Sequence, residues 1–101
     1  PYLLIEVESV ESAQTPEQVE ERERRIRFYE HSGCRKTEVY SLLFGVEYRI
    51  LYLPLEDALP ADGEVKAALE QVYRLIVPPL VNGDEESFHK VCRCFFGSEH
   101  R

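Results

Sequence analysis

The stretch RERRIRFYEHSG, at residues 22–33, is the most informative part of this 101-residue chain. It is typical of the second half of a charged helix, and Gly33 can take the left-handed conformation that closes many helices. Phe28 and Tyr29 then fall on the last turn of that helix. A phenol in this position could donate a proton or a hydrogen bond to a thiolate or an amine bound beside the helix end.

The same helix has a well-marked beginning. Thr15 can cap it, Pro16 suits its first position, and Gln18 completes a capping box. Glutamates come first and arginines later, an order that suits the helix dipole. The apolar residues form one narrow stripe, made of Val19, Ile26, Phe28 and Tyr29. We therefore expect a mostly solvated helix over residues 16–32 with a single contact face.

Strands are expected on both sides of this helix. Residues Tyr2 to Val7 alternate between two faces, as a strand does. Residues Cys34–Phe44 and Val46–Leu55 are rich in β-branched and aromatic side chains and meet at Gly45, which predicts an antiparallel hairpin. One glycine is short for a two-residue turn, so a flanking residue must join it.

A second helix is expected from about Asp62 to Val77, where apolar residues recur at helical spacing, and Pro78-Pro79 should end it. The predicted fold class is α+β: the hairpin and the N-terminal strand form a three-stranded sheet, with one long helix and this second, C-terminal helix. Residues 1–79 form the domain. Residues 80–101 are expected to be a partly ordered C-terminal tail.

Composition and charge exclude several classes of function. A net charge of −7 argues against binding of nucleic acid, which requires clustered cations. No apolar run approaches the roughly 18–20 residues that a membrane helix needs. Three cysteines, an odd number, favour a reducing cytoplasmic setting over a disulfide framework.

The order strand, charged helix ending in Phe-Tyr-Glu, glycine, strand, glycine, strand resembles the C-terminal half of a GNAT-family N-acetyltransferase. The carrying residues are Leu3–Val7, Arg25–Arg35 and Phe44–Tyr52, so the resemblance covers roughly half of the chain. It implies a partial GNAT fold that transfers acetyl from acetyl-CoA to a primary amine. The first strand would match the strand that splays from its predecessor to admit acetyl-CoA, and the long helix would flank the pantetheine arm.

The resemblance also implies roles for three residues. Tyr29 falls on the position of the tyrosine that protonates the departing CoA thiolate; the alternative is an anchor between helix and sheet. Arg22 and Arg25 replace a usual asparagine and a usual small residue, and they could reach the CoA phosphates. The alternative is a solvated face with ion pairs four residues apart: Glu20 with Arg24, Glu21 with Arg25, and Glu23 with Arg27. The glycine-rich turn that holds the CoA pyrophosphate in this family has no counterpart in the sequence.

Two further groups of residues are candidate sites. Glu6 and Glu8 on the first strand could bind an amine or act as a base, or they could simply mark the exit of the strand into solvent. His89, Cys92 and Cys94 are possible zinc ligands, but they lack the partner pair of a structural site, so no metal is expected.

A non-catalytic role is the competing functional hypothesis. The first strand would have an open edge and apolar side chains, a combination that invites pairing with another chain. The chain would then be a GNAT-like module that acts by association, for example as a homodimer through its N-terminal strand.

Overall fold

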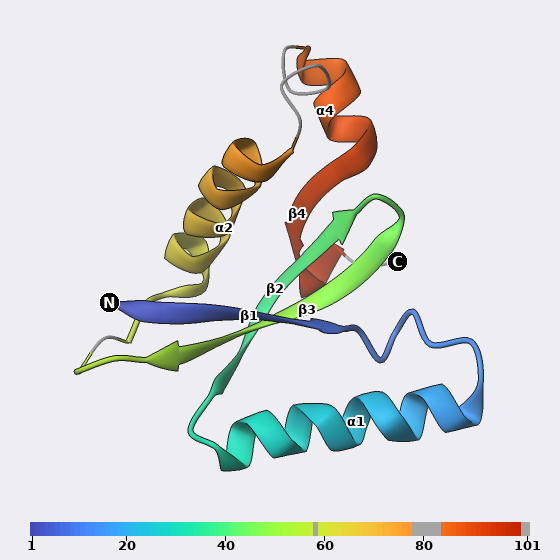
Figure 1. Cartoon of the computed structure of the whole chain (residues 1–101), viewed down its shortest axis with the longest axis vertical. Helices are drawn as coiled ribbons and strands as arrows, with labels where there is room; N and C mark the ends of the chain where they lie inside the picture. Colours follow the sequence, from blue (N-terminus) through green and yellow to red (C-terminus); the bar gives the residue numbers. More distant parts are fainter. Residues whose placement is uncertain (58, 78–83, 100–101) are drawn as a thin grey trace.

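The computed structural model describes residues 1–57, 59–77 and 84–99 (Figure 1). These residues confirm the α+β class, with one four-stranded antiparallel sheet. None of the described helices is long and apolar enough to cross a membrane. The elements in chain order are β1 (Tyr2–Glu8), α1 (Pro16–His31), β2 (Arg35–Leu43), β3 (Val46–Pro54), α2 (Asp62–Ile76), α4 (Glu85–Val91), β4 (Cys92–Phe96) and the 3-10 turn η1 (Gly97–Glu99).

The prediction of three strands is wrong, because β4 forms a fourth strand that pairs antiparallel with β2. Cys92 and Cys94 of β4 are buried in the same core as α2, while Phe95 stacks on Tyr40 with ring centroids 5.6 Å apart. This strand lies in the segment predicted to be a tail, and Phe88 of α4 also belongs to the main core. Residues 78–83, which include the expected Pro78-Pro79 helix stop, lie outside the described residues.

The order of strands in the sheet, β1-β3-β2-β4, accounts for the placement of the helices. α1 connects β1 to β2, and α2 with α4 connects β3 to β4, so each connection skips one strand in the same direction across the sheet. β1 and β3 are antiparallel, so two connections of the same hand leave their helices on opposite faces. Figure 1 shows the strands between α1 and α2.

The sheet therefore has two cores of unequal size. On the α1 face, one hydrophobic cluster consists of the buried residues Val7, Ile26, Cys34 and Leu51. α1 buries a single residue there, Ile26, as the narrow stripe in its sequence predicts. The larger hydrophobic cluster, on the α2 face, consists of Val39, Ile50, Tyr52, Val65, Leu69, Tyr73, Val77, Phe88, Cys92 and Cys94.

The β2–β3 turn uses two residues, as the short spacing requires. Phe44 and Gly45 both have positive φ, 49° and 83°, and they lie between the paired residues Leu43 and Val46. Two consecutive positive φ values are typical of a type I′ turn, whose twist matches that of a hairpin. The prediction that a flanking residue joins the turn is confirmed.

Candidate functional site

Tyr29 is positioned by the way α1 ends. The backbone N–H of Cys34 donates to the carbonyl of Tyr29 at 2.9 Å, and that of Gly33 donates to Glu30 at 3.1 Å. With Gly33 at φ 97°, this is a Schellman motif, which closes a helix with a left-handed residue. The motif fixes Tyr29 one turn before the chain enters β2. Thr15 caps the other end of the helix, as predicted, by accepting from the N–H of Gln18.

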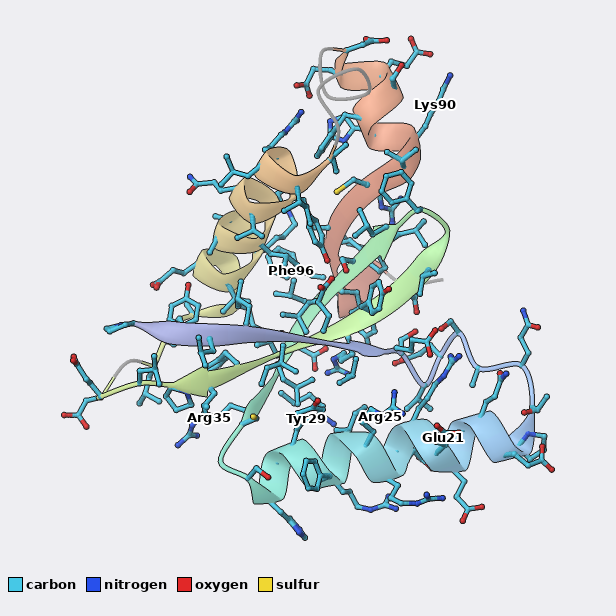
Figure 2. All side chains as sticks on the ribbon, viewed as in Figure 1. Glu21, Arg25, Tyr29, Arg35, Lys90 and Phe96 are labelled. Atoms are coloured by element: carbon cyan, nitrogen blue, oxygen red, sulfur yellow. The ribbon has the colours of Figure 1, made fainter. Side chains whose placement is uncertain are left out.

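The Tyr29 ring lies between α1 and the sheet. It is half-buried and packs against the core cluster that contains Val7 and Leu51. Its edge meets the ring of Phe28, which is 65% exposed. Figure 2 shows Tyr29 on the side of α1 that faces the strands. None of the hydrogen bonds among the described residues uses its hydroxyl, which leaves that hydroxyl available to a ligand.

Arg22, a predicted phosphate contact, closes the loop between β1 and α1. One guanidinium nitrogen donates to the Ser9 carbonyl at 2.9 Å and to the Ser12 hydroxyl at 3.1 Å. The other lies 3.6 Å from the Glu8 carboxylate, and the side chain is only 15% exposed. Much of the hydrogen-bonding capacity of Arg22 is therefore used within the fold.

Arg25, the second predicted phosphate contact, lies one turn further along α1. It pairs with Glu21 at 3.2 Å, and its side chain is about half exposed (49%). Arg24 pairs with Glu20 at 4.0 Å. Two of the three predicted pairs on this face thus form; the third, Glu23 with Arg27, is absent among the described residues. Arg25 and Tyr29 both lie on α1 (Figure 2), whereas Arg22 binds Ser9 and Ser12 of the preceding loop.

The two carboxylates of β1 have different partners. Glu8 is engaged by Arg22. Glu6 accepts a hydrogen bond from the hydroxyl of Tyr73 in α2, which in turn lies 2.9 Å from the Ser41 hydroxyl in β2. Tyr73 and Ser41 are 1% and 0% exposed, so this polar chain runs from the core to the surface at β1. Burial, and then the hydrogen bond to Glu6, raise the pKa of Tyr73.

The chain Ser41–Tyr73–Glu6 was not predicted from the sequence. Tyr73 is one of the apolar residues that recur at helical spacing in the predicted second helix, and it is buried there. A fully buried tyrosine needs a partner for its hydroxyl, and this requirement is a usable signal. The sequence alone does not say which of many glutamates provides it.

The possible zinc ligands are not arranged as a metal site. Cys92 and Cys94 are buried, and burial raises the pKa of their thiols to about 11 and about 12. The Nε2 atom of His89 lies 3.2 Å from the Glu85 carboxylate, and both side chains are exposed. The described residues contain no group of three or more histidine, cysteine, aspartate or glutamate side chains that could hold a metal ion.

A cleft of about 440 Å³ separates α2 from α4 and β4, and the two buried cysteines reach its wall. Arg74 stands over the Phe88 ring at 3.6 Å and binds Glu85 at 2.8 Å. This stacked ion pair ties α4 to α2. The Arg74 guanidinium at the cleft therefore has a structural partner already.

The arrangement places two functional groups beside β1, the half-buried Tyr29 and the exposed Glu6. Tyr29 packs against the core on one face of the sheet, and the Glu6 carboxylate is bound by Tyr73 on the other. β1 itself is an edge strand, paired only with β3 among the described residues. Comparison of the chain with protein-family models, curated proteins and solved structures gave no match.

Proposed function

We propose that this chain is the C-terminal portion of a GNAT-like N-acetyltransferase that transfers acetyl from acetyl-CoA to a primary amine. The observation that carries the proposal is the position of Tyr29, in the last turn of α1, against the sheet, with a hydroxyl that no described residue engages. The element order from β1 to β3 agrees with it, as does the place of β1 at the edge of the sheet.

In the proposed reaction, Tyr29 acts as the general acid. The amine nitrogen attacks the thioester carbonyl, so that a C–N bond forms and the C–S bond breaks. The phenolic proton of Tyr29 passes to the departing thiolate, the amine loses its extra proton to solvent, and solvent reprotonates the tyrosine. A phenol suits this role because it keeps its proton at neutral pH until the thiolate develops.

In this proposal, the open edge of β1 is the binding site for the pantetheine arm of acetyl-CoA. The backbone N–H and C=O groups on that edge have no partner among the described residues, and an extended amide chain such as the pantetheine arm can pair with such groups. Arg25 could exchange its exposed pair with Glu21 for a CoA phosphate at little cost. Arg22 would first have to release Ser9 and Ser12.

The proposal is tested by binding and by turnover. Calorimetry should detect acetyl-CoA binding to the protein translated from the full open reading frame that contains this sequence, and weaker binding to the 101-residue chain. In the full protein, Tyr29→Phe should lower kcat about 100-fold, the lower end of what a general acid contributes, with nearly unchanged affinity for acetyl-CoA. Tyr48→Phe, a half-buried tyrosine on the other face, is the matched control. If neither protein binds acetyl-CoA, the proposal is wrong.

A second candidate function is association without catalysis, through the same edge of β1. Leu3 is 53% exposed on this strand, and an edge strand with apolar side chains is a template for pairing. A homodimer would join two chains of net charge −7, so its stability should rise with salt. Size-exclusion chromatography with light scattering at low and high salt tests this, and a monomer in both would refute it.

A further inference from the structure

The hydrogen bonds around Tyr73 have a definite direction that ends at Glu6. A tyrosine hydroxyl has one proton, and Tyr73 donates it to the Glu6 carboxylate. The Ser41 hydroxyl, 2.9 Å away, must then donate to the Tyr73 oxygen. The proton order is therefore Ser41 to Tyr73 to Glu6, from the centre of the sheet to its open edge.

The hydrogen bond from Tyr73 holds the Glu6 side chain by one carboxylate oxygen and leaves the other oxygen available. The bond from Tyr73 uses the Oε2 atom, and none of the described donors reaches Oε1. Glu6 is exposed to solvent, although its partner is almost completely buried. An exposed glutamate on a strand normally samples several rotamers, so the bond to a buried, packed tyrosine restricts where the free oxygen can lie.

Glu6 and Tyr29 flank the same part of β1 from opposite faces. Alternate residues of a strand point to opposite sides, so Glu6 and Val7 face different layers. Val7 lies in the core cluster against which Tyr29 packs, and Glu6 contacts α2 through Tyr73. A reacting group at the open edge of this segment would have a phenol on one side and a carboxylate on the other.

Charge distinguishes what each side can bind. A carboxylate repels the phosphates of CoA and attracts an ammonium group, so Glu6 suits the acceptor and not the acetyl donor. The net charge of −7 adds to the attraction for a cation. A tyrosine hydroxyl keeps its proton at neutral pH, and burial raises the pKa of Tyr73 further, so the donor to Glu6 persists into alkaline solution.

We infer that Glu6, held by the Ser41–Tyr73 hydrogen bonds, binds the cationic amine of the acetyl acceptor at the open edge of β1. This inference rests on the proposed acetyl transfer, which defines the amine acceptor as the substrate. It favours acceptors, such as a diamine, in which one amine reacts and a second amine carries the positive charge that Glu6 binds. Glu6 is a binding residue in this account, and Tyr73 is a positioning residue.

The experiment uses the full open reading frame with acetyl-CoA and 1,5-diaminopentane as the probe. Glu6→Gln should raise KM for the diamine about tenfold, equivalent to about 1.4 kcal/mol, while KM for acetyl-CoA stays unchanged. Tyr73→Phe should raise the same KM by a smaller factor, because it removes the hydrogen bond that positions the Glu6 carboxylate but leaves the carboxylate itself in place. Glu64→Gln changes another carboxylate near β1, in the first turn of α2, and should leave both constants as they are.

A binding measurement separates this inference from the acetyltransferase proposal. NMR titration of the 101-residue chain with 1,5-diaminopentane should shift the backbone amide signals of Glu6 and its neighbours, and Glu6→Gln should abolish the shifts. Glu6 is exposed, so this variant should fold, and circular dichroism checks that it does. Diamine binding without acetyl-CoA binding would sink only the acetyltransferase proposal. An unchanged diamine KM in folded Glu6→Gln, or no shifts in the wild-type chain, would overturn the role of Glu6.

Discussion

Cys92 and Cys94 are adjacent residues of one strand face, both buried against α2. Burial is the largest cause of their raised pKa values, about 11 and about 12 against an ordinary value of 9.0. The thiolate is the nucleophilic form of cysteine. Both thiols should therefore resist alkylating reagents in the native protein at neutral pH and react only when the chain unfolds.

The same pKa values predict a loss of stability in alkali. Between pH 9 and pH 11 the unfolded thiols lose protons that the folded thiols keep, so the free energy of unfolding falls as the pH rises. At pH 10 the expected loss is about 1.4 kcal/mol per thiol relative to pH 8. Urea unfolding at the two pH values measures it.

Cys94→Ala is the control for this alkaline effect. The variant should be less stable than the wild type at pH 8. On going to pH 10 its free energy of unfolding should fall by about 1.4 kcal/mol less than that of the wild type, because one thiol is missing. Tyrosine ionisation begins near pH 10 in both proteins and cancels in the comparison. Equal losses in the two proteins would contradict the assignment to the thiol.

Residue-level predictions from the sequence succeeded where the cause was local. Thr15 and Gly33 mark the ends of α1 through their immediate neighbours, and both act as predicted. The partner of Tyr73 was not predictable, because Glu6 is 67 residues away and its place opposite Tyr73 depends on the whole sheet. Arg22 also binds a loop whose path the sequence does not specify.

At the level of elements, the β2–β3 turn is the clearest site of backbone strain. Phe44 has φ 49°, a conformation that costs a residue with a side chain about 1–2 kcal/mol. Its ring is 57% exposed, so little packing offsets this cost. Its backbone N–H donates to the Val91 carbonyl at 2.7 Å, a bond that any residue except proline can make.

Phe44→Asn should therefore stabilise the protein by about 1 kcal/mol, because asparagine followed by glycine is the preferred pair for a type I′ turn. Thermal unfolding measures the gain. Gly45→Ala is the opposite control: at φ 83° alanine is strained, and the variant should lose stability. If Phe44→Asn is less stable than the wild type, the packing of the phenyl ring contributes more free energy than its exposure indicates.

The element that the sequence prediction missed, β4, did carry a strand signal. Cys92, Cys94 and Phe96 alternate with Arg93 and Phe95, but the run is five residues long and follows a short helix. Its burial on both sides depends on β2 and α2, which lie far away in the sequence. The hairpin of β2 and β3 was predictable because its two strands and their turn are contiguous.

For the whole molecule, α4 and β4 are part of the core and not an appendage. Phe88, Cys92 and Cys94 are buried in the larger core, and β4 covers the outer edge of β2. A chain of residues 1–79 would lose all of these side chains at once. We expect it to lose cooperative unfolding, since removing even one large buried side chain costs roughly 2–5 kcal/mol and a domain of this size has little stability to spare.

Near-ultraviolet circular dichroism and urea unfolding of this truncated chain test the expectation. A chain that lacks only residues 100–101 is the control and should unfold as the full sequence does. A cooperative transition in the 1–79 chain would show that the first three strands form an independent domain.

The sheet order has a consequence for how quickly the protein folds. Among the described strands, only β2 and β3 are joined by a short loop. Tyr2 pairs with Pro54, and Val39 pairs with Phe96, each across about half of the chain. Closing such long loops costs entropy before any contact repays it, which slows folding. During synthesis on a ribosome, the β2–β3 hairpin can form early, but β2 cannot pair with β4 until the C-terminal residues have emerged. Until then both edges of the nascent sheet are open, and a chaperone would have its longest opportunity to bind at this stage.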